Sequence, residues 1–223
     1  VGSEMCIRDR LYTMTYYSQW KQDEYIYNTF FKNKTEPGVF LEIGADDGVR
    51  FSNCKFFEET HNWTGIAVEA RQGAYDKLIT NRTCTCVRAV LSDVIEETKF
   101  MDIKGYGLGL SGLINKYDPR HVDRIRQEIK NPNNNGVSVI DVKTEKLNEL
   151  LDSHKMTNID FLSIDTEGSE LAILKTLDFN KYNIDVITIE DNYKDEELMK
   201  FFTSRNYTFV KQIECDKIFR KNA

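Results

Sequence analysis

The sequence lacks any long apolar run. Nowhere in its 223 residues is there an uninterrupted apolar stretch of the kind a membrane-crossing helix needs, which is about 18 residues. It also shows no charged-then-apolar leader of the secretory type. We therefore expect a cytoplasmic protein without a membrane span.

Basic residues are in the minority. The chain has 30 Lys and Arg against 36 Asp and Glu, a net charge of −6. Nucleic-acid binding depends on a basic surface that neutralises phosphates, so we expect no nucleic-acid partner. The three histidines, His61, His121 and His154, share no motif, and we interpret each as a surface residue, although His121, in the insertion described below, could be recruited as a catalyst.

Cysteines are few and odd in number. The five are scattered in a chain large enough to build a core without disulfides, which favours reduced thiols. Cys84 and Cys86 suggest a metal pair, but no second pair of ligands lies nearby in the sequence, so zinc is not expected.

Glycine is also sparse, and the dinucleotide fingerprint G-x-G-x-x-G is missing. An apolar strand expected over residues 39–43 runs instead into Gly44-x-x-x-Gly48, with Glu42, Asp46 and Asp47 around it. These carboxylates would repel a pyrophosphate but suit S-adenosylmethionine, which has a sulfonium, an ammonium and a ribose diol. An ordinary strand-to-helix turn remains the alternative for this motif alone.

Further strands are expected to end in acidic residues. Residues 65–69 end in Glu69, where a carboxylate can accept hydrogen bonds from ribose hydroxyls. Residues 85–91 are followed by Ser92 and Asp93, whose side chains could bind the amino group of an adenine. Strands over 159–165 and 184–190 bring Asp165 and Glu190 to the same edge, where open parallel sheets bind ligands.

The remaining segments set the expected domain organisation. Residues 1–15 resemble translated adapter sequence and are treated as a non-native or disordered leader. Residues 16–223 are expected to form a single domain, with an insertion at about 102–136 that carries substrate specificity. Near its start, Gln22 and Asp23 either pack in the core or line a cofactor pocket.

Taken together, these motifs resemble the FkbM family of S-adenosylmethionine-dependent methyltransferases. The resemblance is carried by Ser18-Gln19, Phe40 to Gly48, Val68-Glu69, Ile159 to Gly168, Ile189-Glu190 and Asp216 to Phe219. It implies an α/β fold: a doubly wound, Rossmann-like sheet of seven strands, with helices on both faces and an antiparallel last strand. It also implies O-methylation of sugar or polyketide hydroxyls. Where the family commonly has proline after the second acidic strand end, this chain has Ala70.

Two carboxylates are candidates for the catalytic base. Asp165 and Glu167 flank the expected position of the transferred methyl group, and one of them would accept the proton of the acceptor hydroxyl. A magnesium ion held by Asp165, Asp191 and Asn192 is the alternative means of activating a hydroxyl.

The predicted cofactor-binding residues follow from these motifs: Glu42, Gly44, Asp46, Gly48, Glu69, Ala70, Ser92, Asp93 and Asp165. The expected partner is a small-molecule or glycan acceptor.

Two other functions stay open at this point: a non-catalytic nucleoside-binding module, and a nicotinamide-dependent sugar oxidoreductase. The oxidoreductase would need the missing glycine fingerprint and a Tyr-x-x-x-Lys pair.

Overall fold

The computed structural model describes residues 14–194 and 196–222. The predicted leader therefore lies almost entirely outside the described residues. Seven strands form the main sheet: β1 (Val39–Ile43), β2 (Thr64–Glu69), β3 (Thr85–Arg88), β8 (Asn158–Ile164), β9 (Asn183–Glu190), β10 (Tyr207–Ile213) and β11 (Asp216–Lys221). The helices are α1 (Gln22–Ile26), which continues as a π-helical turn (Tyr27–Phe31), α2 (Lys55–His61), α3 (Gln72–Asn81), α4 (Pro119–Glu128), α5 (Leu147–Ser153), α6 (Glu170–Lys175) and α7 (Glu196–Thr203).

The order of strands in the main sheet is β10-β11-β9-β8-β1-β2-β3. Neighbouring strands from β3 to β9 are parallel, whereas β11 pairs antiparallel with both β9 and β10. The order reverses between β1 and β8, which is where open α/β sheets bind ligands. The predicted seven-stranded sheet with an antiparallel last strand is confirmed.

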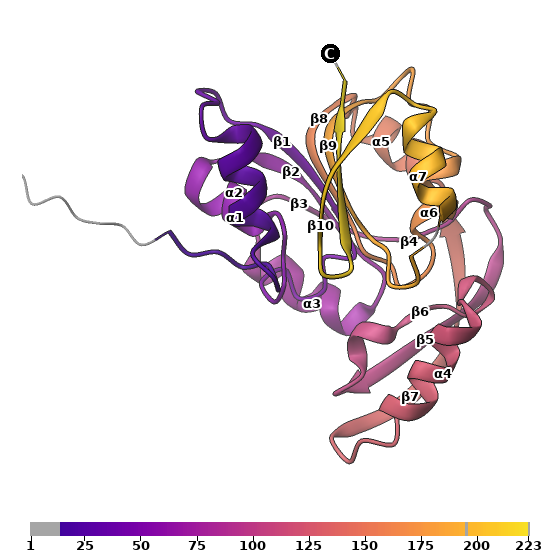
Figure 1. The fold of residues 1–223 in the computed structure, drawn as a ribbon. Coiled ribbons are helices and arrows are strands. Elements are labelled where there is room, and N and C mark those ends of the chain that lie inside the picture. Colours follow the sequence, from indigo (N-terminus) through magenta and orange to yellow (C-terminus); the bar gives the residue numbers. More distant parts are fainter. Residues whose placement is uncertain (1–13, 195, 223) are drawn as a thin grey trace, which may run out of the picture.

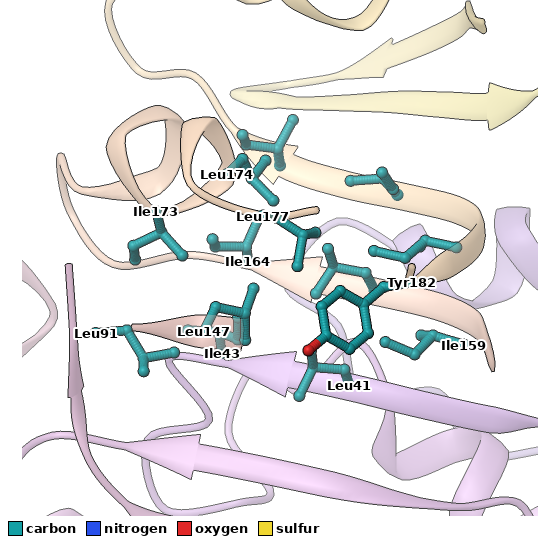
Figure 2. Packing of buried hydrophobic residues seen from close by; sticks show 14 of the residues in the cluster. Leu41, Ile43, Leu91, Leu147, Ile159, Ile164, Ile173, Leu174, Leu177 and Tyr182 are labelled. Carbon is teal, nitrogen blue, oxygen red and sulfur yellow. The ribbon is translucent and has the colours of Figure 1, made fainter. Parts of the chain in front are cut away.

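Alternating side chains of the strands explain why helices cover both faces of the sheet (Figure 1). In β1, Leu41 and Ile43 pack into the core beneath α5, α6 and α7, whereas Phe40 packs on the other face with α1 and α2. Figure 2 shows Leu41 and Ile43 with Leu147 of α5, and with Ile173 and Leu174 of α6. The doubly wound arrangement follows from strands that are apolar on both faces.

A second sheet of four strands projects from one end of the molecule (Figure 1). Its order is β4-β7-β5-β6, with β4 (Val90–Leu91), β5 (Glu97–Gly105), β6 (Gly112–Leu113) and β7 (Asn134–Glu145). Short 3₁₀ turns (Leu108–Leu110 and Ile114–Lys116) and α4 connect these strands. The long β5 and β7 strands pair antiparallel, from Glu97 opposite Lys143 to Gly105 opposite Asn134.

The third predicted strand is split between the two sheets. Residues 85–88 pair with β2, but Val90 and Leu91 pair with Thr144 and Glu145 of β7. One continuous strand over residues 85–91 was therefore the wrong expectation. Because of this split, the chain after Leu91 follows the second sheet instead of the main one.

The first helix is anchored by buried polar side chains. Asp23 accepts hydrogen bonds from the amide of Tyr17 at 2.7 Å and from Ser18 Oγ at 2.5 Å, and Gln22 donates to Asp216 Oδ2 at 2.6 Å. Gln22 and Asp23 thus have a structural role.

In the described part of the chain, no helix is long and apolar enough to span a bilayer.

Candidate active site

A cleft of about 510 Å³, here called the main cleft, lies at the carboxyl ends of β1, β2, β8 and β9. Its floor includes Gly44, Glu69 and Asp165. The second sheet contributes the opposite wall, including Phe100 and Leu108. The two sheets together therefore enclose a space of the size that takes a nucleoside-type ligand.

Gly44 lets the ends of β1 and β8 approach each other. Its φ is +86°, and a β-carbon at this position would lie 1.7 Å from the carbonyl oxygen of Asp165. The amide of Gly44 donates to Val68 O at 2.9 Å, which fixes the turn against β2. Gly48 also has positive φ, but it faces Leu78 and does not line the main cleft.

Glu69 ends β2 inside the main cleft. Its carboxylate accepts hydrogen bonds from the amides of Asp46 at 2.9 Å and Arg71 at 2.8 Å. Burial raises the pKa of Glu69, and the adjacent Arg71 guanidinium opposes this rise. Asp46 lines the same wall and forms ion pairs with Arg50 and Arg71. A carboxylate held in this way suits a ligand with two hydroxyl groups.

Glu42 lies outside the main cleft. Its carboxylate accepts hydrogen bonds from Ser52 Oγ at 2.8 Å and the amide of Asn53 at 2.9 Å, and forms an ion pair with Arg82 at 2.7 Å. Its place in β1 turns this side chain to the face opposite Ile43. Glu42 therefore positions the segment between β1 and α2.

Ser92 and Asp93 also lie outside the main cleft, because the chain leaves the main sheet before them. Asp93 instead pairs with Lys116 at 2.6 Å. The positions that line this end of the main cleft are Ala89, Val90 and Leu91, next to Ala70. An adenine ring here would meet apolar side chains and backbone.

Several carboxylates lie close together at the centre of the main cleft. Oxygen atoms of Asp165, Glu170 and Glu190 lie within 4.8 Å of one another. Burial and then the charges of Asp216 and Glu170 raise the pKa of Asp165 to about 7. The Asp165 side chain is exposed to the main cleft.

Glu167 and Glu190 belong to the same group of acids. Burial, followed by the charge of Asp165, raises the pKa of both side chains above the ordinary range. The proximity of like charges favours the protonated forms of these acids.

Of the expected magnesium ligands, Asp165 belongs to the group of acids that lie together at this site. The Glu170 carboxylate already accepts hydrogen bonds from the backbone, from the amides of Thr166 at 2.7 Å and Gly168 at 3.0 Å. Asp191, which was expected to be a ligand, pairs with Lys217. The expected set of Asp165, Asp191 and Asn192 is not the group that comes together among the described residues.

His121 of α4 is buried beside the acidic group. Its Nε2 lies 3.2 Å from Leu110 O and therefore donates, which leaves Nδ1 to accept from the Tyr193 hydroxyl at 3.0 Å. The same Nδ1 lies 3.6 Å from Glu167. Burial lowers the pKa of His121, which favours the neutral ring. The expectation of a surface residue was wrong for His121, since nothing in the sequence predicted that α4 would pack here.

Two residues of the main cleft had no signal in the sequence. Trp20 lines it just before the buried pair Gln22 and Asp23, and Arg124 of α4 lines it from the side of the second sheet. Arg124 could not be found from local spacing because its position depends on how α4 packs.

Comparison with known proteins agrees with this architecture. The family model described as the FkbM methyltransferase domain matches residues 42–209. Among curated proteins, no relative matches this chain.

Two solved structures are similar to the chain in their fold. One is M. capricolum TrmK in complex with S-adenosylhomocysteine, with 14% identity and a TM-score of 0.46 over 93% of this chain and 70% of that chain. The other is a putative RNA methyltransferase from Pyrococcus horikoshii, with 12% identity and a TM-score of 0.44 over 91% of this chain and 82% of that chain. Because the family model spans well over half of the sequence, the chain belongs to the FkbM family of S-adenosylmethionine-dependent methyltransferases.

Proposed function

We propose that this protein methylates a hydroxyl group on a sugar, polysaccharide or other small metabolite. The observation that carries the proposal is the group of acids with raised pKa values at the centre of the cleft, which includes Asp165 and Glu167. A carboxylate whose pKa lies near the working pH is suited to act as a general base.

The residues of the main cleft fit S-adenosylmethionine. Glu69 would accept hydrogen bonds from the ribose hydroxyls, and Gly44 and Asp46 would lie against the methionine end. Ala70 and Leu91 would contact the adenine. The acids around Asp165 favour a cationic ligand, because a positive charge relieves their mutual repulsion.

When bound, the cofactor supplies a methyl group on a positively charged sulfur. Asp165 or Glu167, in its ionised form, would take the proton of the acceptor hydroxyl as the oxygen–carbon bond forms. Phe100, Leu108 and Leu110 would exclude water from the site.

The test is transfer of tritium from labelled S-adenosylmethionine to a panel of methyl glycosides. We expect Glu167→Gln or Asp165→Asn to lower kcat by about 10²- to 10⁴-fold. The affinity for S-adenosylhomocysteine should change much less than kcat. Full activity in both single variants and in the double variant would refute these residues as bases. Glu149, an exposed residue of α5, provides the matched control Glu149→Gln.

A further inference from the structure

A second cavity of about 560 Å³, here called the side cavity, adjoins the main cleft. Both spaces are lined by Glu167, Glu190 and Asn192, so these residues form the boundary between them. None of the cofactor-binding residues proposed above lines the side cavity. A ligand there would approach the acids from a different side than a nucleoside in the main cleft.

The side cavity is built jointly by the chain before and within α4 and by the segment that follows β9. Tyr193 of that segment is held by two contacts with α4. Its hydroxyl bonds to His121 Nδ1 at 3.0 Å, and the Arg120 guanidinium lies over its ring, 4.7 Å from the ring centre. The Tyr193 ring is therefore held in place before any ligand arrives, which reduces the entropic cost of binding.

Acidic side chains outnumber basic ones in the lining of the side cavity. Its acids are Asp118, Glu167, Glu170, Glu190, Asp191 and Glu196, and its bases are Lys116, Arg120 and Lys194. Arg120 already pairs with Asp118 at 2.7 Å, and Lys116 pairs with Asp93 at 2.6 Å. Little positive charge is left to bind an anion, so a phosphate or carboxylate group would be repelled.

One oxygen at the boundary has unused bonding capacity. Glu167 Oε2 is buried and accepts no hydrogen bond from any described residue. It lies 3.6 Å from His121 Nδ1, which is already engaged by Tyr193. A hydroxyl entering from the side cavity could donate to this oxygen.

We propose that the side cavity is the acceptor pocket, that it selects an uncharged or amine-bearing polyol over an anionic one, and that Tyr193 positions this acceptor. This inference rests on the methyltransferase function proposed above. In the step itself, the acceptor oxygen forms a bond to the methyl carbon while the carbon–sulfur bond breaks and its electron pair stays on sulfur. The hydroxyl proton passes to Glu167.

The test uses the full chain with labelled S-adenosylmethionine and five classes of acceptor. These are methyl glycosides, amino sugars, uronic acids, sugar phosphates and a short RNA. Binding of S-adenosylhomocysteine is measured first by calorimetry on each variant. Leu171 lines only the side cavity and Leu108 only the main cleft, so Leu171→Trp and Leu108→Trp are a matched pair.

We expect methyl transfer to glycosides or amino sugars and at least tenfold less to the three anionic classes. Leu171→Trp and Tyr193→Ala should each raise the acceptor KM at least tenfold and leave the Kd for S-adenosylhomocysteine within threefold. Leu108→Trp should weaken that Kd. Leu171 packs against the core, so Leu171→Trp can fail to fold. In that case Tyr193→Ala provides the test.

Preferred transfer to an anionic acceptor, or an acceptor KM unchanged in Tyr193→Ala, would overturn the inference and leave the methyltransferase function in place. Binding of S-adenosylhomocysteine without transfer to any class would also refute the proposed acceptor class. Absence of S-adenosylhomocysteine binding by the unmodified chain would instead refute the proposed cofactor site itself.

Discussion

At the scale of single residues, Asp165 links protein stability to pH. Its pKa is raised to about 7 in the folded chain, whereas an unfolded Asp titrates near pH ~3.9. Between these values the folded state holds a proton that the unfolded state has lost, so this group makes stability fall as pH rises through that window. Above about pH 7, its full destabilising effect is present.

Asp165→Asn should therefore stabilise the protein without ligand, and more at pH 8 than at pH 5. Differential scanning calorimetry would measure this as a higher Tm, with roughly 2–4 °C for each kcal/mol gained. Glu167 and Glu190 also have raised pKa values, so some pH dependence should remain in the variant. An equal change in Tm at both pH values would contradict the assigned pKa.

Gly44 offers a second test at this scale. Gly44→Ala should weaken S-adenosylhomocysteine binding at least tenfold and lower Tm, because its β-carbon would collide with the carbonyl of Asp165. Gly73 in α3 is the control, since a β-carbon there meets nothing within 4 Å. Gly73→Ala should stabilise the protein by about 0.5–1 kcal/mol. Unchanged binding in Gly44→Ala would show that this turn tolerates a side chain.

The site was only partly predictable from its residues. Gly44, Asp46, Glu69 and Asp165 line the main cleft as expected, because each lies at or within three residues of the end of a parallel strand. Glu42 does not, because its side chain alternates to the other face and meets Arg82, 40 positions later in the sequence. No local pattern shows that an ion pair will form between residues so far apart.

At the scale of elements, Arg82 joins three parts of the fold. It follows α3, and its fully buried side chain pairs with Glu42 of β1 at 2.7 Å and with Glu58 of α2 at 2.5 Å. Despite burial, the Arg82 guanidinium and nearby hydrogen bonds lower the pKa of Glu58 to about 2. The Glu58 carboxylate is kept ionised by this guanidinium.

Removing Arg82 should be severely destabilising. Arg82→Met leaves the buried Glu42 and the half-buried Glu58 without a positively charged partner, and a loss of about 3–5 kcal/mol is typical when a buried ion pair is broken in this way. Urea unfolding measures this loss, and adding Glu42→Gln to the variant should restore part of it. Lys175→Met, which breaks an exposed pair with Glu197, is the control and should hardly move the urea midpoint. A loss for Arg82→Met no larger than for this control would contradict the structural role.

The second sheet shows which elements the sequence left undetermined. An insertion was predicted at about residues 102–136. The split at Ala89, by which β4 leaves the main sheet to pair with β7, was not predicted. It depends on hydrogen bonds between residues more than fifty positions apart, which no local periodicity encodes.

At the scale of the whole molecule, the parallel sheet gathers distant carboxylates at one edge. Glu69, Asp165 and Glu190 come from three different strands, yet all three line the main cleft. The doubly wound sheet was expected from the family resemblance, and its strands have the apolar side chains on both faces that buried parallel strands need. We infer that this acidic edge holds S-adenosylmethionine through Glu69.

Calorimetric titration with S-adenosylhomocysteine tests this claim most directly, using the unmodified chain, Glu69→Ala and the exposed-site control Glu149→Ala. We predict micromolar binding by the unmodified chain and by the control. Glu69→Ala should bind roughly 10- to 100-fold more weakly, because it loses charge-assisted hydrogen bonds to the ribose. No binding by the unmodified chain, or equal affinity in Glu69→Ala, would contradict the claim.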